Sequence, residues 1–139
     1  MKEFIKKADV LIEALPYIRK FRGKVVVIKY GGSALNNELR SATVEDIIFM
    51  HFAGIKVVVV HGGGPFITQA LDEGGKRSSF INGLRVTDRE TLNIVEDVLI
   101  NKVNREIVEM IKTRGAEAKG LTDKEVGLIK ARQIKKELG

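Results

Sequence analysis

The sequence contains no cysteine, only two histidines, and few aromatic residues. Without cysteine, neither a disulfide framework nor a thiolate metal site can form. His51 and His61 lie too far apart in the sequence to indicate a metal motif, so we expect no metal site. No apolar run approaches the roughly 20 residues of a membrane span, and residues 1–7 lack the apolar segment of a signal peptide. We therefore expect a cytoplasmic protein with no membrane partner.

The remaining composition is typical of a soluble domain. The chain has 139 residues, of which 44% are hydrophobic and 30% charged, and this length can bury a full core. The net charge of +6 could indicate a nucleic-acid partner. However, the lysines are scattered among glutamates and no basic stripe exists, so we expect no nucleic acid and favour small anionic ligands.

Two segments share one pattern, in which a run of β-branched residues leads into glycines. Residues 57–65 read Val-Val-Val-Val-His-Gly-Gly-Gly-Pro, and residues 25–33 read Val-Val-Val-Ile-Lys-Tyr-Gly-Gly-Ser. The β-branched runs favour fully buried strands, and the glycines allow sharp turns that lie close to a ligand. In an open parallel sheet, such turns and the helix N-terminus that follows bind anions at the carboxyl ends of the strands. The pair of turns therefore predicts a phosphate site.

The expected elements follow the order of an α/β domain. We expect strands at 24–30 and 55–60, helices at 38–53 and 65–72, a hairpin at Asn82-Gly83, and a helix over 88–112 that opens with a capping box of Thr87 and Glu90. Two short strands are expected near 116–119 and 126–131. A strand–helix–strand unit of this length implies parallel strands. The predicted fold class is α/β, a three-layer α/β/α sandwich with a mainly parallel open sheet.

Two helices carry apolar residues that predict contacts with other subunits. Residues 1–22 form a helical arm, kinked at Pro16, and the α/β domain follows over 23–139. From the residues alone, the arm either covers the core of its own domain or meets another subunit. The 88–112 helix has more apolar residues than one face needs, which predicts a dimer contact. Its inward stripe is Leu92, Val95, Leu99, Val103, Ile107 and Ile111, and its surplus apolar residues are Ile94, Val98, Ile100, Val108 and Met110.

Lys29 and Arg85 are the candidate ligands of an anionic substrate. Lys29 ends an otherwise apolar strand, and it either extends into water or neutralises a transferring phosphoryl group as a point charge. Arg85 follows the Asn-Gly turn, and its planar guanidinium suits a carboxylate. The alternative for Arg85 is a solvated hairpin arginine. Neither glycine turn fits a Walker P-loop or a Gly-x-Gly-x-x-Gly dinucleotide site.

Four motifs in combination resemble the acetylglutamate kinases of the amino acid kinase family. They are Val-Ile-Lys-Tyr-Gly-Gly-Ser-Ala at 27–34, Val-Val-His-Gly-Gly-Gly-Pro at 59–65, Asn-Gly-Leu-Arg-Val-Thr-Asp at 82–88, and Val-Asn-Arg-Glu-Ile-Val at 103–108. The arm, with Glu-Ala-Leu-Pro-Tyr-Ile at 13–18, is similar to the arm of the arginine-inhibited, hexameric members, where it interlaces dimers. The resemblance thus favours a homo-oligomer formed through the 88–112 helix and the arm.

The resemblance implies a kinase of arginine biosynthesis that uses N-acetyl-L-glutamate and ATP. It would transfer the γ-phosphoryl group of ATP, which enters with Mg²⁺ as co-substrate, to the side-chain carboxylate of acetylglutamate, with no tightly bound cofactor. Lys29 would be catalytic and stabilise the transferring group. The backbone of Gly31 and Gly32 would bind the phosphoryl group, and the substrate would be bound by Gly63, Gly64 and Arg85.

The chain departs from this family in two respects. Members are considerably longer, and the chain resembles their amino-terminal, acetylglutamate-binding half, so we expect little or no activity from it alone. Residues 120–127 read Gly-Leu-Thr-Asp-Lys-Glu-Val-Gly, which differs from the family pattern and leaves the role of Lys124 open. Two alternatives are a non-catalytic assembly or regulatory module of the same family, and another phosphotransferase with this fold.

Overall fold

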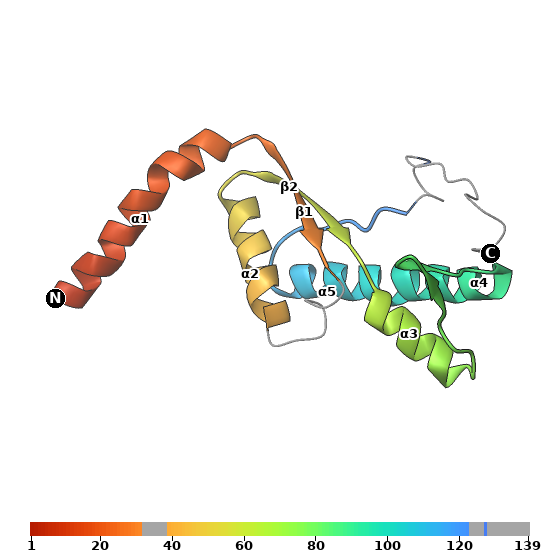
Figure 1. The fold of residues 1–139 in the computed structure, drawn as a ribbon. Helices are drawn as coiled ribbons and strands as arrows, with labels where there is room; N and C mark the ends of the chain where they lie inside the picture. The colour runs from red at the N-terminus through yellow and green to blue at the C-terminus, as the bar shows by residue number, and fades with distance from the viewer. Residues whose placement is uncertain (32–38, 123–126, 128–139) are drawn as a thin grey trace.

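A computed structural model describes residues 1–31, 39–122 and 127, and its centre is a pair of parallel strands (Figure 1). The elements in chain order are α1 (Lys2–Phe21), β1 (Val25–Tyr30), α2 (Leu39–Phe52), β2 (Lys56–His61), α3 (Gly64–Glu73), β3 (Phe80–Ile81), β4 (Leu84–Arg85), α4 (Arg89–Asp97), the π-helical segment η2 (Val98–Asn104) and α5 (Arg105–Thr113).

The strands β1 and β2 pair in parallel, with Val25 opposite Lys56 and Tyr30 opposite His61. The connection between them contains α2, which ends before Gly54, whose φ of +84° suits a glycine. The predicted α/β class with parallel strands is therefore confirmed. The N–H of Gly62 donates to the carbonyl oxygen of Tyr30 at 2.9 Å, so the pairing continues into the glycine turn.

The strand pair is covered on one face only in the described part of the chain. Val57 and Val59 pack against the core beneath α2, whereas Val25 and Val27 on the other face are 63% and 65% exposed. The expectation of strands buried on both faces was therefore wrong for these residues, because no described element covers the second face. The buried core comprises residues of the first face, α2, α3 and the long helix, among them Tyr30, Val44, Ile47, Leu71, Val98, Val103, Ile107 and Ile111.

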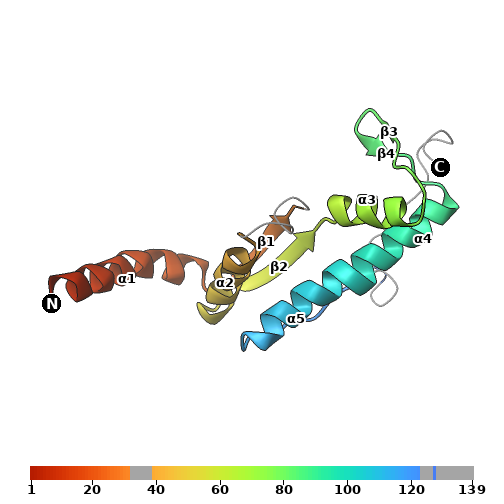
Figure 2. The same cartoon turned by 90° about the horizontal axis from the view of Figure 1, so that it is seen from below.

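One long helical stretch, formed by α4, η2 and α5, runs alongside α3 and past the strands (Figure 2). Its middle segment is π-helical, and Val98 and Val103, five residues apart, are both buried. The predicted inward stripe is buried or packs against the core cluster at Val95, Leu99, Val103, Ile107 and Ile111. It is wrong at Leu92, which is 52% exposed, and it omits Val98, which is buried. The reason is that a π turn contains an additional residue and shifts the inward face.

Some of the additional apolar residues on the long helix pack into the core of the chain itself. Val98 is buried, and Ile94 and Met110 pack against the core cluster. Fewer apolar residues therefore remain for a partner than the sequence indicated, although a dimer contact through this helix stays a prediction.

Helix α4 begins with a different cap from the predicted one. Asp88 is the N-cap residue, and its Oδ1 accepts a hydrogen bond from the N–H of Thr91 at 2.8 Å. Thr87 instead donates its hydroxyl to the carbonyl oxygen of Arg85, and Glu90 accepts a hydrogen bond from Lys76. The capping box was wrong because the carboxylate of Asp88 takes the capping position and Lys76 attracts Glu90.

The hairpin at Asn82-Gly83 is confirmed, whereas the strand near 116–119 is not. Asn82 and Gly83 have φ of +50° and +80° between β3 and β4, as a type I′ turn requires. Residues 116–120 have no regular secondary structure. Apart from Gly127, the strand expected at 126–131 lies outside the described residues.

Helix α1 projects from the rest of the chain as an arm (Figures 1 and 2). It is one continuous helix that contains Pro16 and bends in its C-terminal part, and none of its residues is buried. Its exposed apolar side chains include Phe4, Leu11, Ile12 and Tyr17. The structure therefore favours a projecting arm over a helix that covers its own domain. No helix among the described residues is both long and apolar enough to cross a membrane.

Candidate functional site

The glycine turn after β2 begins beside the last residue of β1, at the carboxyl end of the strand pair. The bond from the Gly62 N–H to the Tyr30 carbonyl oxygen joins the end of β2 to the end of β1, just before Gly31. Beyond its neighbours in the chain, a Cβ built on Gly31 or on Gly64 would meet no atom of the described residues within 4 Å, which leaves room for a ligand beside the backbone there. Gly32 lies outside the described residues.

Gly63 packs closely against η2. A Cβ at this position would lie 2.6 Å from Cδ2 of Leu99, so a side chain here would force the end of the Leu99 side chain to move. Helix α3 starts at the next residue, Gly64, with Pro65 in its first turn. The first N–H groups of a helix have no partner within the helix and carry a partial positive charge. The turn after β2 is therefore suited to an anion.

Arg85 brings a positive charge to this helix N-terminus. Its Nη2 donates to Oγ1 of Thr68 at 2.9 Å and to the carbonyl oxygen of Gly64 at 3.3 Å, and its Nη1 donates to Oγ of Ser78. The guanidinium carbon lies 4.7 Å from the ring centre of Phe80. Of the predicted site residues, the structure thus brings together Arg85 and the glycines of the turn after β2.

An ion cluster fixes the base of the hairpin that carries Arg85. Lys76 Nζ lies 2.8 Å from both carboxylate oxygens of Asp88 and 2.8 Å from Oε2 of Glu90. The hydrogen bond from Lys76, followed by that from the Thr91 N–H, holds the pKa of Asp88 well below its usual range. The bonds to Asp88 and then Glu90 raise the pKa of Lys76. No periodic pattern links these residues, so sequence reasoning missed the cluster.

Lys29 lies at the end of β1 on the exposed face of the strand pair, opposite Val60. Within the described ranges, its ammonium group has no hydrogen bond or ion pair to another residue. The structure does not bring Lys29 into contact with Arg85. Lys29 directly precedes Tyr30, whose carbonyl oxygen accepts from the Gly62 N–H. The Lys29 side chain is exposed to solvent at this end of the strand pair.

Tyr30 is buried on the opposite face, where the charge of the half-buried Arg40 acts on its hydroxyl. Tyr30 is 3% exposed, and burial raises the pKa of its hydroxyl, although Arg40 opposes this shift. Arg40 donates to Oε2 of Glu106 at 2.7 Å and so joins α2 to α5. Neither the Tyr30 hydroxyl nor Nε of Arg40 has a hydrogen-bond partner among the described residues.

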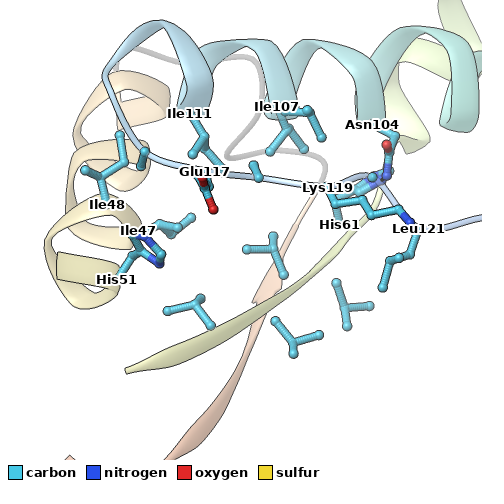
Figure 3. A pocket seen from close by; sticks show the side chains of 18 of the residues that line it. Ile47, Ile48, His51, His61, Asn104, Ile107, Ile111, Glu117, Lys119 and Leu121 are labelled. Atoms are coloured by element: carbon cyan, nitrogen blue, oxygen red, sulfur yellow. Dashed lines mark hydrogen bonds between the residues drawn. The ribbon is translucent and has the colours of Figure 1, made fainter. Parts of the chain in front are cut away.

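A cavity of about 500 Å³ lies on the core side of β2, under residues 116–122 (Figure 3). Apolar side chains from β2, α2 and α5 form most of its wall, and Lys29, Gly63, Gly64 and Arg85 do not line it. At one end, Asn104 and His61 point toward each other. The cavity thus reaches His61 but does not include the glycines of the turn that follows it. Among the described residues, no group of three or more His, Asp or Glu side chains could hold a metal ion.

Comparison with known proteins decides the family. The sequence profile of the amino acid kinase family matches residues 24–138. The chain belongs to the amino acid kinase family. Acetylglutamate kinase from Carboxydothermus hydrogenoformans is 54% identical over 132 residues, which are 94% of this chain and 45% of that relative. Acetylglutamate kinase from Heliobacterium modesticaldum is also 54% identical, over 96% of this chain and 45% of the relative. The chain thus spans less than half the length of these curated relatives.

Solved structures support the same fold for this amino acid kinase family member. The protein smu.665 from Streptococcus mutans UA159 matches with a TM-score of 0.72 and 29% identity, over 81% of this chain and 45% of that one. N-acetylglutamate synthase from Neisseria gonorrhoeae, solved with coenzyme A and L-arginine, matches with a TM-score of 0.56 and 25% identity, over 78% of this chain and 26% of that one.

Sequence reasoning missed four residues that the structure places around the turn and hairpin. Thr68 and Ser78 carried no signal by themselves, because a hydroxyl becomes a partner of Arg85 only when the hairpin folds onto α3. Lys76 resembled any surface lysine. Asn104 was part of a motif, but its contact with His61 depends on how η2 passes β2.

Proposed function

We propose that this chain forms the acceptor-binding part of an acetylglutamate kinase. The reaction is the transfer of the γ-phosphoryl group of ATP to the side-chain carboxylate of N-acetyl-L-glutamate, a step of arginine biosynthesis. The observation that carries the proposal is the position of Arg85, whose guanidinium lies beside Gly64 at the start of α3. Identity of 54% to acetylglutamate kinases over nearly the whole chain supports the same substrate.

Binding of acetylglutamate uses a charge and a set of backbone donors. Arg85 binds the α-carboxylate through its planar guanidinium, and the N–H groups of Gly63 and Gly64 donate to oxygens of the substrate. Thr68, Ser78 and Phe80 hold the guanidinium in place. A clamp whose partners are already fixed in the free protein loses little entropy when the ligand arrives.

Phosphoryl transfer needs positioning and charge stabilisation more than a covalent nucleophile. An oxygen of the substrate's side-chain carboxylate attacks the γ-phosphorus, the bond to the β–γ bridging oxygen breaks, and ADP leaves. Lys29 stabilises the charge on the transferring group, and the backbone of Gly31 and Gly32 donates to its oxygens. Mg²⁺ enters with ATP as part of the co-substrate, and the proposal includes no tightly bound cofactor. Because both substrates are soluble anions, we place the reaction in the cytoplasm.

The chain by itself should bind acetylglutamate weakly and turn over slowly or not at all. It spans 45% of the length of its relatives, so the rest of their chains has no counterpart here to hold the nucleotide in line. Misplacing the reacting groups by about 1 Å can already cost roughly 100-fold in rate.

A second candidate function is assembly without turnover. The observation that favours it is α1, which has no buried residue and exposes Phe4, Leu11 and Tyr17. A projecting apolar arm suits a contact between copies of the chain, and a dimer through the long helix would leave the arm available for higher-order assembly. Oligomerisation and catalysis are compatible, so this candidate replaces the first only if no substrate binds.

Calorimetric titration of the 139-residue chain with N-acetyl-L-glutamate tests the proposal. We expect Arg85→Ala to weaken binding by roughly 10- to 150-fold, since a hydrogen bond to a charged group contributes about 1.5–3 kcal/mol. Arg89→Ala, which removes an exposed arginine from the first turn of α4, is the matched control and should bind as the parent chain does. Equal affinity of the parent chain and Arg85→Ala would contradict an acceptor site at Arg85.

Competition separates acetylglutamate from the substrates of other phosphotransferases with this fold. Aspartate or carbamate should not displace acetylglutamate at equal concentration. A coupled ATPase assay with acetylglutamate, using the chain fused to the remaining part of a relative, then distinguishes an enzyme from an assembly module.

A further inference from the structure

His61 and Asn104 form a hydrogen-bonded pair behind the glycine turn that follows β2. Nδ2 of Asn104 lies 3.3 Å from Nε2 of His61, and Nδ1 of His61 lies 3.1 Å from the carbonyl oxygen of Gly62. A side-chain amide nitrogen can only donate, so Nε2 of His61 accepts. In the neutral imidazole the proton then sits on Nδ1, which donates to the Gly62 carbonyl oxygen. One tautomer satisfies both contacts, and the other satisfies neither.

Asn104 is held in place by its own surroundings. It is the last residue of η2, and the π turn puts Val98 and Val103 on the same buried face. In an uninterrupted α-helix, one residue fewer would rotate Asn104 by about 100° away from β2. On its other side the chain passes so close at Gly120 that a Cβ there would overlap with Oδ1 of Asn104. The amide is therefore enclosed between β2 and residue 120.

We propose that Asn104 and His61 act as positioning residues that fix the direction of the Gly63 N–H in the anion-binding turn. In a trans peptide the carbonyl of one residue and the N–H of the next point in opposite directions. When His61 binds the Gly62 carbonyl oxygen, the Gly63 N–H must point away from the imidazole. The Gly62 N–H is already bound to the Tyr30 carbonyl oxygen, so Gly62 is fixed on both sides.

Hydrogen bonds hold the neighbouring peptides, since the Gly62 N–H donates to Tyr30 and the Gly63 carbonyl oxygen accepts from the Ile67 N–H at 2.9 Å. For the Gly62–Gly63 peptide itself, the bond to His61 is the one that the described residues supply. Glycine adopts many backbone conformations, and Gly62, Gly63 and Gly64 follow one another. Neither Gly63 nor Gly64 donates its N–H to a backbone carbonyl in the part of the chain that the structure describes. Contact with Leu99 limits where Gly63 lies but not how its peptide is turned. The imidazole supplies that orientation without touching the ligand.

The inference rests on the proposed function only for the identity of the anion. The tautomer and the two hydrogen bonds can be measured without any ligand. A failure to bind acetylglutamate would contradict the proposed function, whereas a wrong tautomer would contradict the positioning role. The two failures are therefore distinguishable in one sample.

Nitrogen-15 spectra of the full chain at pH 8 test the tautomer directly. The chain has only two histidines, and the exposed His51 serves as an internal reference, because an unconstrained imidazole in water favours the proton on Nε2. We expect the proton of His61 on Nδ1. Asn104→Asp replaces the donor by an acceptor of the same shape and should put a proton on Nε2 of His61. Observation of the Nε2 tautomer or the cation for His61 in the parent chain would overturn the inference.

Two substitutions of His61 separate positioning from packing. The amide nitrogen of an asparagine at position 61 can take the place of Nδ1, whereas that of a glutamine reaches the place of Nε2. We expect His61→Asn to keep most of the affinity for N-acetyl-L-glutamate. His61→Gln should weaken binding by about 2- to 12-fold, which corresponds to about 0.5–1.5 kcal/mol for one hydrogen bond. Equal loss in both variants would indicate a packing role and overturn the inference.

The amide signal of Gly63 provides a readout if acetylglutamate does not bind. Without ligand, its chemical shift should change more in His61→Gln than in His61→Asn, because only the glutamine variant loses the bond to the Gly62 carbonyl oxygen. Asn101→Ala is the control for a change elsewhere on the helix, since Asn101 is exposed and its side-chain amide donates to Oδ1 of Asp97. Equal changes of the Gly63 signal in the folded His61→Asn and His61→Gln variants would overturn the inference.

Discussion

Arg85 and Thr68 are joined by a hydrogen bond of 2.9 Å from Nη2 to Oγ1, and this bond ties the β3–β4 hairpin to α3. The Thr68 hydroxyl also donates to the carbonyl oxygen of Gly64 at 3.1 Å. One hydroxyl therefore connects the charge of the candidate site to the residue that begins the helix. Its effect on binding can be separated from its effect on packing.

Replacing Thr68 by valine should weaken acetylglutamate binding. The valine keeps the branched shape but cannot accept from Arg85, so we expect a loss of about 2- to 12-fold, the value of one hydrogen bond. Thr68→Ser keeps the hydroxyl and should retain most of the affinity. Calorimetric titration of the three chains measures this. If the serine variant lost as much as the valine variant, the methyl group and not the hydroxyl would be responsible.

Loss of Lys29 should affect the rate and not the affinity for acetylglutamate. In the proposed reaction its charge stabilises the transferring group, where negative charge develops in the transition state. In a protein completed with the rest of a relative's chain, Lys29→Ala should therefore lower kcat strongly and leave KM for acetylglutamate nearly unchanged. Steady-state kinetics measure both constants.

Lys56→Ala is the matched control for Lys29. Lys56 lies on the same exposed face but at the opposite end of the strand pair, opposite Val25. Its removal should leave kcat unchanged. A comparable fall in kcat for both variants would point to the general positive charge of this face and contradict a specific role of Lys29.

The stability supplied by the Lys76–Asp88 pair should disappear in acid. Lys76 holds the pKa of Asp88 below the value of about 3.9 for an unfolded chain. The pair therefore stabilises the folded state above about pH 4, and this contribution is lost as the pH falls further and the carboxylate takes up a proton. Asp88→Asn keeps a capping side chain for the Thr91 N–H but removes the charge.

Thermal unfolding at several pH values tests the pair. We expect Asp88→Asn to have a lower Tm than the parent chain at pH 7 and the difference to shrink below about pH 4. Added salt should also reduce the difference, because Asp88 is exposed. A difference in Tm that stays constant from pH 7 to acid pH would mean that cap geometry, and not charge, is responsible.

Removal of residues 1–22 should lower the oligomeric state without unfolding the α/β domain. No residue of α1 is buried, so the core should lose little support. We expect the full chain to form at least a dimer, and the shortened chain to form no assembly larger than a dimer. Sedimentation equilibrium at high micromolar concentration measures the masses. A monomeric full chain would contradict the predicted oligomer.

The elements that local signals specify were predicted well. Continuous β-branched runs located β1 and β2, and Asn82-Gly83 located the hairpin with both residues at positive φ. Gly54, at positive φ, marked the end of the helix before β2. Each of these features depends on a few neighbouring residues, so the information needed to predict it is present in a short stretch of sequence.

The errors arose where distant residues compete for one position. Asp88 and Thr87 are both good caps, and Lys76 and Thr91 decide between them because both bond to Asp88. Which residues of the long helix face inward depends on a π turn, and no local sequence preference indicates that turn. Whether a valine strand is buried on both faces depends on which elements are present to cover it.

The sequence alone determined the strand–glycine turns, the charges beside them and the likeness to acetylglutamate kinases. These follow from residue type and spacing, which folding does not alter. Only the tertiary structure decided that Arg85 reaches Gly64 and Thr68, that Lys29 lies on the exposed face, and that Asn104 binds His61 behind the turn. The physical reason is that a hydrogen bond requires two atoms about 3 Å apart. For residues as far apart in the chain as His61 and Asn104, only the packing of helices on strands creates that distance.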